Sequence, residues 1–141
     1  MVERRVRGLL DTNVAIDLPY IEADALPVDM AISPITLAEL TVGPLSTDCP
    51  LKRAQRQTRL QQVEGAFDPL PFDAEAARRY GAVHAAVSAA GRSARRRFAD
   101  LLIACVAMSN DLPLFTANVQ DYAGLERLLT VVPVPVPQNP L

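Results

Sequence analysis

The chain has 141 residues, half of them hydrophobic and 21% charged, which fits one globular domain with an ordinary core and not a disordered protein. Its net charge of −2 argues against a generic nucleic-acid coat, although its arginines are clustered. The arginines near the N-terminus precede no long apolar run, so we expect no signal peptide, no membrane span and a cytoplasmic location.

The first half of the chain alternates apolar runs with helical patterns. One apolar run ends on Asp11, and either Thr12 or Asn13 is placed to cap the short helix that follows. The serine–proline pair at 33–34 is a helix start, and the glycine–proline pair at 43–44 is a helix end. We expect a strand over 6–10, a helix over 14–18, a strand over 30–32, a helix over 33–43, a polar helix over 51–64 and a proline-interrupted edge strand over 67–72.

The second half continues this alternation. Asp73 is placed to cap a long helix whose apolar positions recur at helical spacing, and Gly91 ends it. We expect a helix over 73–91, a basic loop over 91–97, a buried helix over 98–108, a strand over 114–116, a short helical piece around 119–122 and a last strand over 128–132. The domain would then span residues 1–132, and a Pro/Val-rich extended tail with a frayed end would span 133–141.

Strands that alternate with helices predict an α/β fold with a parallel sheet covered on both faces. In such a sheet the carboxyl ends of the strands lie on one edge. Asp11 follows the first strand directly, and Glu39 lies in the helix after the second strand. Asp100 lies in the first turn of the helix that feeds the third strand, and Asn118 and Asp121 follow that strand. The topology therefore brings acids or amides from four segments to one rim.

Carboxylates that converge in this way need compensation, because like charges raise each other's pKa. A hard divalent cation such as Mg²⁺ or Mn²⁺ supplies it, since such ions prefer oxygen ligands. With a single histidine and no cysteine cluster in the chain, zinc is a poor fit. A carboxylate-bound Mg²⁺, for which Mn²⁺ can substitute, suits the hydrolysis of phosphodiester bonds.

Four motifs carry a family resemblance: Leu10-Asp11-Thr12-Asn13, Ser33-Pro34-Ile35-Thr36-Leu37-Ala38-Glu39-Leu40, Ala99-Asp100-Leu101-Leu102-Ile103-Ala104 and Phe115-Thr116-Ala117-Asn118-Val119-Gln120-Asp121-Tyr122. In this order they resemble the PIN-domain ribonucleases, and specifically the VapC toxins of prokaryotic VapBC toxin–antitoxin pairs. The resemblance implies a PIN-like three-layer α/β/α sandwich with a central, mainly parallel sheet of about five strands. It also implies that the chain is a metal-dependent endoribonuclease in which Asp11, Glu39 and Asp100 bind the metal.

The fourth acidic position departs from the family pattern. Many relatives have Asp two residues after the threonine, where this chain has Asn118. Either Asp121 substitutes as a catalytic acid, or Asn118 holds a water or the substrate phosphate. We expect one tightly bound ion.

The remaining candidates concern the substrate. Arg95, Arg96 and Arg97 lie just before Asp100, so we assign them to the RNA backbone, although such a run is by default a solvated loop. We also assign Thr12, Asn13, Thr116 and Asn118 to substrate binding. Aromatic residues are scarce, which favours recognition of RNA by shape and backbone, with structured tRNA or rRNA as plausible substrates.

The resemblance implies partners as well. VapC toxins are similar in forming homodimers and in being neutralised by a small VapB-type antitoxin that wraps an amphipathic segment along the toxin. We therefore expect a homodimer, a cognate antitoxin, and contact with DNA only indirectly through that antitoxin.

Two other readings stay open. A phosphatase of the haloacid dehalogenase type also places an Asp after its first strand, but it needs a second Asp where this chain has Asn13. A catalytically inactive PIN fold that binds RNA or protein is the other alternative, and the intact Asp11, Glu39 and Asp100 argue against it.

Overall fold

Strand β1, Arg7–Leu10, lies inside a parallel sheet whose strand order is β2-β1-β3-β4. The computed structural model describes residues 5–137. Within them β1 pairs with β2, Asp29–Ala31, on one side and with β3, Leu114–Thr116, on the other, and β3 pairs with β4, Val131–Pro133. The described sheet has four strands where we expected about five.

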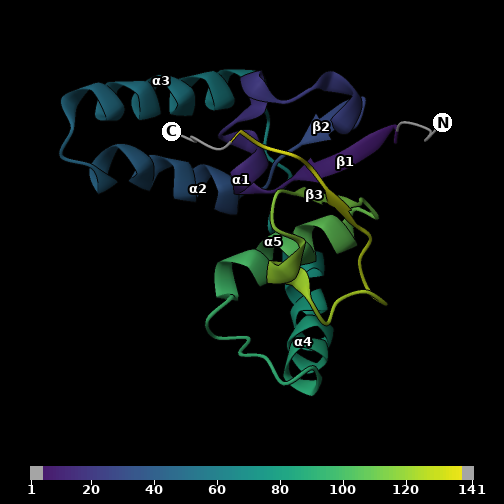
Figure 1. Ribbon diagram of the computed structural model, residues 1–141. Coiled ribbons are helices and arrows are strands. Elements are labelled where there is room, and N and C mark those ends of the chain that lie inside the picture. The colour runs from purple at the N-terminus through teal and green to yellow at the C-terminus, as the bar shows by residue number, and fades with distance from the viewer. Residues whose placement is uncertain (1–4, 138–141) are drawn as a thin grey trace.

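Helices cover both faces of this sheet (Figure 1). The longest are α3, Pro50–Ala66, and α4, Ala74–Ala89. Helix α2, Pro34–Val42, runs alongside α3 and forms an antiparallel pair with it on one face, whereas α4 and α5, Phe98–Ser109, lie on the other. None of the helices in residues 5–137 is long and apolar enough to cross a membrane. The remaining α-helix is α1 (Thr12–Ala15). The 3-10 helices are η1 (Leu18–Tyr20), η2 (Ala23–Ala25), η3 (Gly43–Ser46) and η4 (Val119–Tyr122).

Alternating side chains of the central strands supply two separate cores. Leu9 and Leu114 point into the core formed with α4 and α5. Leu10 and Phe115, the next residue on each strand, point into the core formed with α1, α2 and α3. All four side chains are at most 3% exposed. The three-layer α/β/α sandwich expected from the sequence is therefore confirmed.

Three predicted helix ends are confirmed, namely the starts of α2 and α4 and the end of α4. The Ser33 side chain accepts a hydrogen bond from the backbone N–H of Thr36, and the Asp73 side chain accepts one from Ala76. Gly91 follows α4 with φ of 74°, a left-handed conformation that glycine adopts without steric cost.

The edge strand expected over 67–72 is wrong. This segment has no regular secondary structure, and it donates one backbone hydrogen bond toward the sheet, from Leu70 to the Ile32 carbonyl at 3.0 Å. Pro69 and Pro71 flank Leu70, and proline holds φ near −65°, away from strand values. The segment therefore bonds to the residue that follows β2 without extending the ladder.

The last strand lies further along the chain than predicted. Residues 125–129 form a turn in which the Leu125 carbonyl accepts hydrogen bonds from Leu128 and Leu129, so β4 begins only at Val131. The ladder runs past the expected domain boundary at 132, because the Val134 N–H donates to the Thr116 carbonyl at 2.9 Å and Val134 is buried. The predicted fraying of residues 138–141 lies outside the described residues.

Candidate active site

Asp11 leaves β1 and immediately caps α1. Its backbone N–H donates to the Phe115 carbonyl at 2.8 Å, and its own carbonyl accepts from Val14 and Ala15. Helix α1 therefore begins at Thr12, two residues earlier than predicted, and its N-cap is Asp11 instead of Thr12 or Asn13. The side chain is 3% exposed, so it must be satisfied from within the protein.

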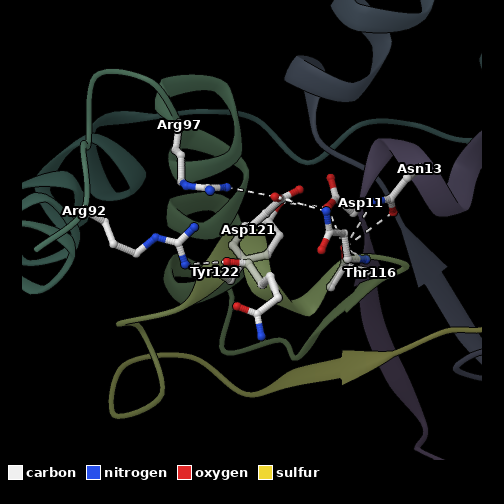
Figure 2. Close-up of polar contacts among 9 residues, drawn as sticks. Asp11, Asn13, Arg92, Arg97, Thr116, Asp121 and Tyr122 are labelled. Atoms are coloured by element: carbon white, nitrogen blue, oxygen red, sulfur yellow. Dashed lines mark hydrogen bonds and ion pairs between the residues drawn. The ribbon is translucent and has the colours of Figure 1, made fainter. Parts of the chain in front are cut away.

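Three donors satisfy the Asp11 carboxylate, and Figure 2 shows the side chains of two of them, Thr116 and Tyr122. Oδ1 accepts the backbone N–H of Thr12 at 2.8 Å. Oδ2 accepts the Thr116 hydroxyl and the Tyr122 phenol, each at 2.8 Å. Burial raises the pKa of Asp11, and these hydrogen bonds oppose that effect because they favour the ionised form. Since two donors fill the lone pairs of Oδ2, Oδ1 is the atom left with capacity for another partner.

Thr116 and Asn13 link the end of β3 to the start of α1. The Thr116 hydroxyl, while donating to Asp11, accepts the Asn118 N–H at 3.0 Å and the Asn13 side-chain amide at 3.3 Å. The Asn13 side-chain oxygen in turn accepts the Ala117 N–H at 3.0 Å. The structure thus places these two residues where they support Asp11, and their predicted contact with substrate stays a prediction.

Thr12 connects α1 to Glu39 on α2. The Thr12 hydroxyl lies 2.6 Å from Oε1 of Glu39 and 2.9 Å from the hydroxyl of Thr36. Glu39 is exposed, whereas Thr36 is buried. The predicted acid of the second segment therefore reaches the same rim as Asp11.

Asp100 lies in the first turn of α5 and is only partly exposed. Burial and the nearby charges of Asp11, Asp121 and Glu39 raise the pKa of Asp100 to about 7, while Arg97 opposes this shift. Charges in a partly buried site are screened less than exposed charges, so those of the other acids act on Asp100. Asp100 therefore lies within electrostatic reach of the three other acids predicted from the sequence, Asp11, Glu39 and Asp121.

The basic loop divides into engaged and free arginines. Arg97 donates to Oδ1 of Asp121 at 2.8 Å, and Arg92 donates to the Gln120 carbonyl at 2.6 Å, so both hold η4 (Figure 2). The side chain of Asn118 donates to the same Oδ1 of Asp121 at 3.2 Å. Arg95 and Arg96 are exposed. Of the three arginines assigned to RNA, two remain available to a ligand.

The donor set fits a hard cation. It consists of carboxylate oxygens, which Mg²⁺ and Mn²⁺ prefer, and burial together with their mutual repulsion raises the pKa of Asp100. Among residues 5–137, no three acidic, histidine or cysteine side chains already stand close enough to hold a metal ion. Holding an ion with three of these side chains at once therefore requires side-chain movement.

Comparison with known proteins identifies the family of this chain. The PIN domain family matches residues 8–120, which is most of the chain. This chain belongs to the PIN-domain family. It is 36% identical over 127 residues to Ribonuclease VapC5 of Mycobacterium tuberculosis, a match that covers 88% of this chain and 91% of that protein.

Solved structures agree with this family assignment. A crystal structure of VapBC-5 from M. tuberculosis, a member of the VapBC family of toxin–antitoxin systems, matches with a TM-score of 0.78 and 35% identity, covering 93% of this chain and 99% of that one. FitAcB from Neisseria gonorrhoeae matches with a TM-score of 0.69 and 27% identity, covering 87% and 94%. Both relatives match this PIN domain over nearly their whole length.

Sequence reasoning missed two residues of the PIN-domain site. Tyr122 is 2% exposed and donates a hydrogen bond to Asp11, a contact that its position in the sequence does not predict. The available signal was that a tyrosine in a core needs a partner for its hydroxyl. Arg92 was counted only as part of the basic loop, and its contact with η4 has no local sequence signal.

Proposed function

We propose that this PIN domain is a metal-dependent endoribonuclease and the toxin of a toxin–antitoxin pair. The similarity to a protein named Ribonuclease VapC5 and to VapBC toxin–antitoxin structures supports both parts. The observation that carries the proposal is that Thr12 bonds both Asp11 and Glu39, and that burial and the charges of Asp11, Asp121 and Glu39 raise the pKa of the nearby Asp100. Four carboxylates in one place destabilise a metal-free site and stabilise a bound cation.

In this proposal Asp11, Glu39 and Asp100 hold one Mg²⁺, for which Mn²⁺ can substitute. Such an ion, when bound, polarises the phosphate and lowers the pKa of a water molecule that attacks it. Asp11 is held rigidly by Thr12, Thr116 and Tyr122, which leaves Oδ1 as its ligand atom. Glu39 reaches the site through its hydrogen bond with Thr12. Arg95 and Arg96, together with Asn118, are the candidates for binding the RNA backbone.

The similarity to a VapBC toxin–antitoxin structure supports an antitoxin partner, and the other partners are proposed from the family resemblance. We propose a VapB-type antitoxin, a homodimer of this chain, a cytoplasmic location, and contact with DNA only through the antitoxin. The RNA is proposed to be tRNA or rRNA, recognised by its shape and backbone.

Cleavage of RNA by the purified chain tests the activity. We expect cleavage in Mg²⁺ that stops on chelation and is lost in both Asp11→Asn and Asp100→Asn. Asp24→Asn is the matched control, because Asp24 is an exposed carboxylate on η2, outside the site, and it should cleave like the wild type. A folded wild-type chain that leaves RNA intact in Mg²⁺ would favour the catalytically inactive binding module.

A further inference from the structure

Arg97 stands between the acidic site and the basic loop. It precedes α5 directly, three residues before Asp100, and its guanidinium lies 2.8 Å from Oδ1 of Asp121. The two side chains are 28% and 27% exposed, so the pair is largely shielded from solvent. An ion pair in such surroundings is stronger than one on an open surface.

The oxygen that Arg97 contacts, Oδ1 of Asp121, has little capacity left for another partner. Oδ1 of Asp121 accepts both the Arg97 guanidinium and the side-chain amide of Asn118. These two donors occupy its lone pairs. A divalent cation that used this oxygen would have to displace Arg97, and it would gain no charge from Asn118.

The sum of the charges in the site also argues against a second divalent ion. Asp11, Glu39, Asp100 and Asp121 would carry one negative charge each, and Arg97 returns one positive charge to the group. One divalent ion then leaves the group close to neutral, with a single negative charge. A second divalent ion would make the group positive, so Arg97 removes the electrostatic reason for binding it.

We infer that Arg97 is a built-in cation that stands where a second divalent ion would otherwise bind, so that the site takes one metal ion. This inference rests on the proposed metal site. The guanidinium has five N–H donors in a fixed plane, so it can hold Asp121 with one edge and meet a phosphate oxygen with another. In two-metal enzymes the second ion stabilises charge on the reacting phosphate, and here Arg97 does so.

Titration of Mn²⁺ into the metal-free protein by calorimetry tests this inference without RNA. We expect one ion per chain in the wild type and also in Asn118→Asp, because Arg97 still occupies the place of the second ion. The double variant Arg97→Gln/Asn118→Asp should bind two. Arg96→Gln/Asn118→Asp makes the same change in charge at an exposed neighbour and should bind one.

Two ions in the wild type or in Asn118→Asp, or one ion in the Arg97→Gln/Asn118→Asp variant, would overturn the inference. If the Arg97→Gln/Asn118→Asp variant does not fold, the variant Arg97→Gln/Asp121→Asn replaces it, because this change leaves the net charge of the Arg97–Asp121 pair unchanged. We expect its affinity for the single Mn²⁺ to stay within about threefold of the wild type, whereas a loss of tenfold or more would make Asp121 a ligand of that ion and overturn the inference. Wild-type cleavage of RNA is measured separately, so the proposed activity can survive a failure of this test.

Discussion

The phenol of Tyr122 donates a hydrogen bond of 2.8 Å to Oδ2 of Asp11, joining two residues that are 111 positions apart in the chain. Both side chains are buried, at 2% and 3% exposure. Burial is also the main reason why the pKa of the Tyr122 phenol is raised, so this hydroxyl stays protonated and remains a donor. Tyr122 therefore fixes the orientation of the central carboxylate from the far end of the sequence.

Tyr122→Phe removes this hydrogen bond and little else. We expect the free energy of unfolding to fall by about 1–3 kcal/mol, because a buried carboxylate oxygen loses one of its donors. Denaturant unfolding of the metal-free protein measures the change. The control is Tyr80→Phe, whose ring packs edge-on against Phe98 and whose hydroxyl has no hydrogen bond within residues 5–137. Equal losses in the two variants would show that the contact with Asp11 contributes nothing to stability.

Metal-free stability should depend on pH through Asp100. Its pKa is raised to about 7, above the value for an unfolded chain, so the protein favours the protonated carboxyl. The corresponding stability is fully present below about pH 4 and is lost as pH rises through 7. Burial raises the pKa of Asp11 as well, which acts in the same direction.

We therefore expect the free energy of unfolding to fall between pH 5 and pH 8, and to fall less in Asp100→Asn. At pH 8 the variant should be the more stable protein by about 2 kcal/mol, a figure that allows for solvent screening of a partly exposed group. Denaturant unfolding in chelator-containing buffer at several pH values measures this. Asp24→Asn should follow the wild type, and parallel pH curves for Asp100→Asn and wild type would contradict the assignment.

Sequence patterns predicted most of the layers and the common edge of the acids because both follow from local signals combined with parallel topology. Helix periodicity and capping residues are local, as at Ser33 and Asp73, and parallel topology then forces strand ends to one edge. Asp11, Glu39 and Asp100 could be placed at that edge without knowing any side-chain position.

The contacts inside the site could not be predicted in this way. The hydrogen bond from Tyr122 to Asp11 and the ion pair of Arg97 with Asp121 depend on tertiary packing between segments that are distant in sequence. The failed edge strand over 67–72 has the opposite origin, because its apolar composition suited a strand while its two prolines did not.

Gly8 marks a close approach between β1 and β3. A Cβ added there would overlap the Phe115 ring, at 2.6 Å from Cδ1, and would lie 3.1 Å from Cγ of Pro27. Phe115 is 3% exposed and belongs to the core formed with α1, α2 and α3, so a shift of its ring would disturb other core side chains. We expect Gly8→Ala to lower the free energy of unfolding by about 1–3 kcal/mol through overpacking.

The same substitution elsewhere in the chain is the control for Gly8→Ala. A Cβ at Gly81, in the interior of α4, would meet nothing within 4 Å. Gly81→Ala should therefore raise the free energy of unfolding by about 0.5–1 kcal/mol, because alanine favours the helix. Chemical unfolding of both variants should give opposite signs, and a neutral Gly8→Ala would show that the ring has room to shift.

The salt dependence of RNA binding tests the exposed arginines of the basic loop. Arg95 and Arg96 are exposed, whereas Arg97 is engaged with Asp121 and is proposed to meet only the reacting phosphate, so we assign the contacts with the other RNA phosphates to the first two. Each lost phosphate contact lowers the slope of log K against log salt by roughly 0.7–0.9, so Arg95→Gln/Arg96→Gln should lower it by about 1.4–1.8. Binding is measured in an Asp11→Asn background to prevent cleavage. Arg78→Gln/Arg79→Gln changes the net charge equally on α4, where both side chains pair with Glu75, and should keep the wild-type slope. If both double variants give the same slope, the loop contributes only general charge and holds no phosphate.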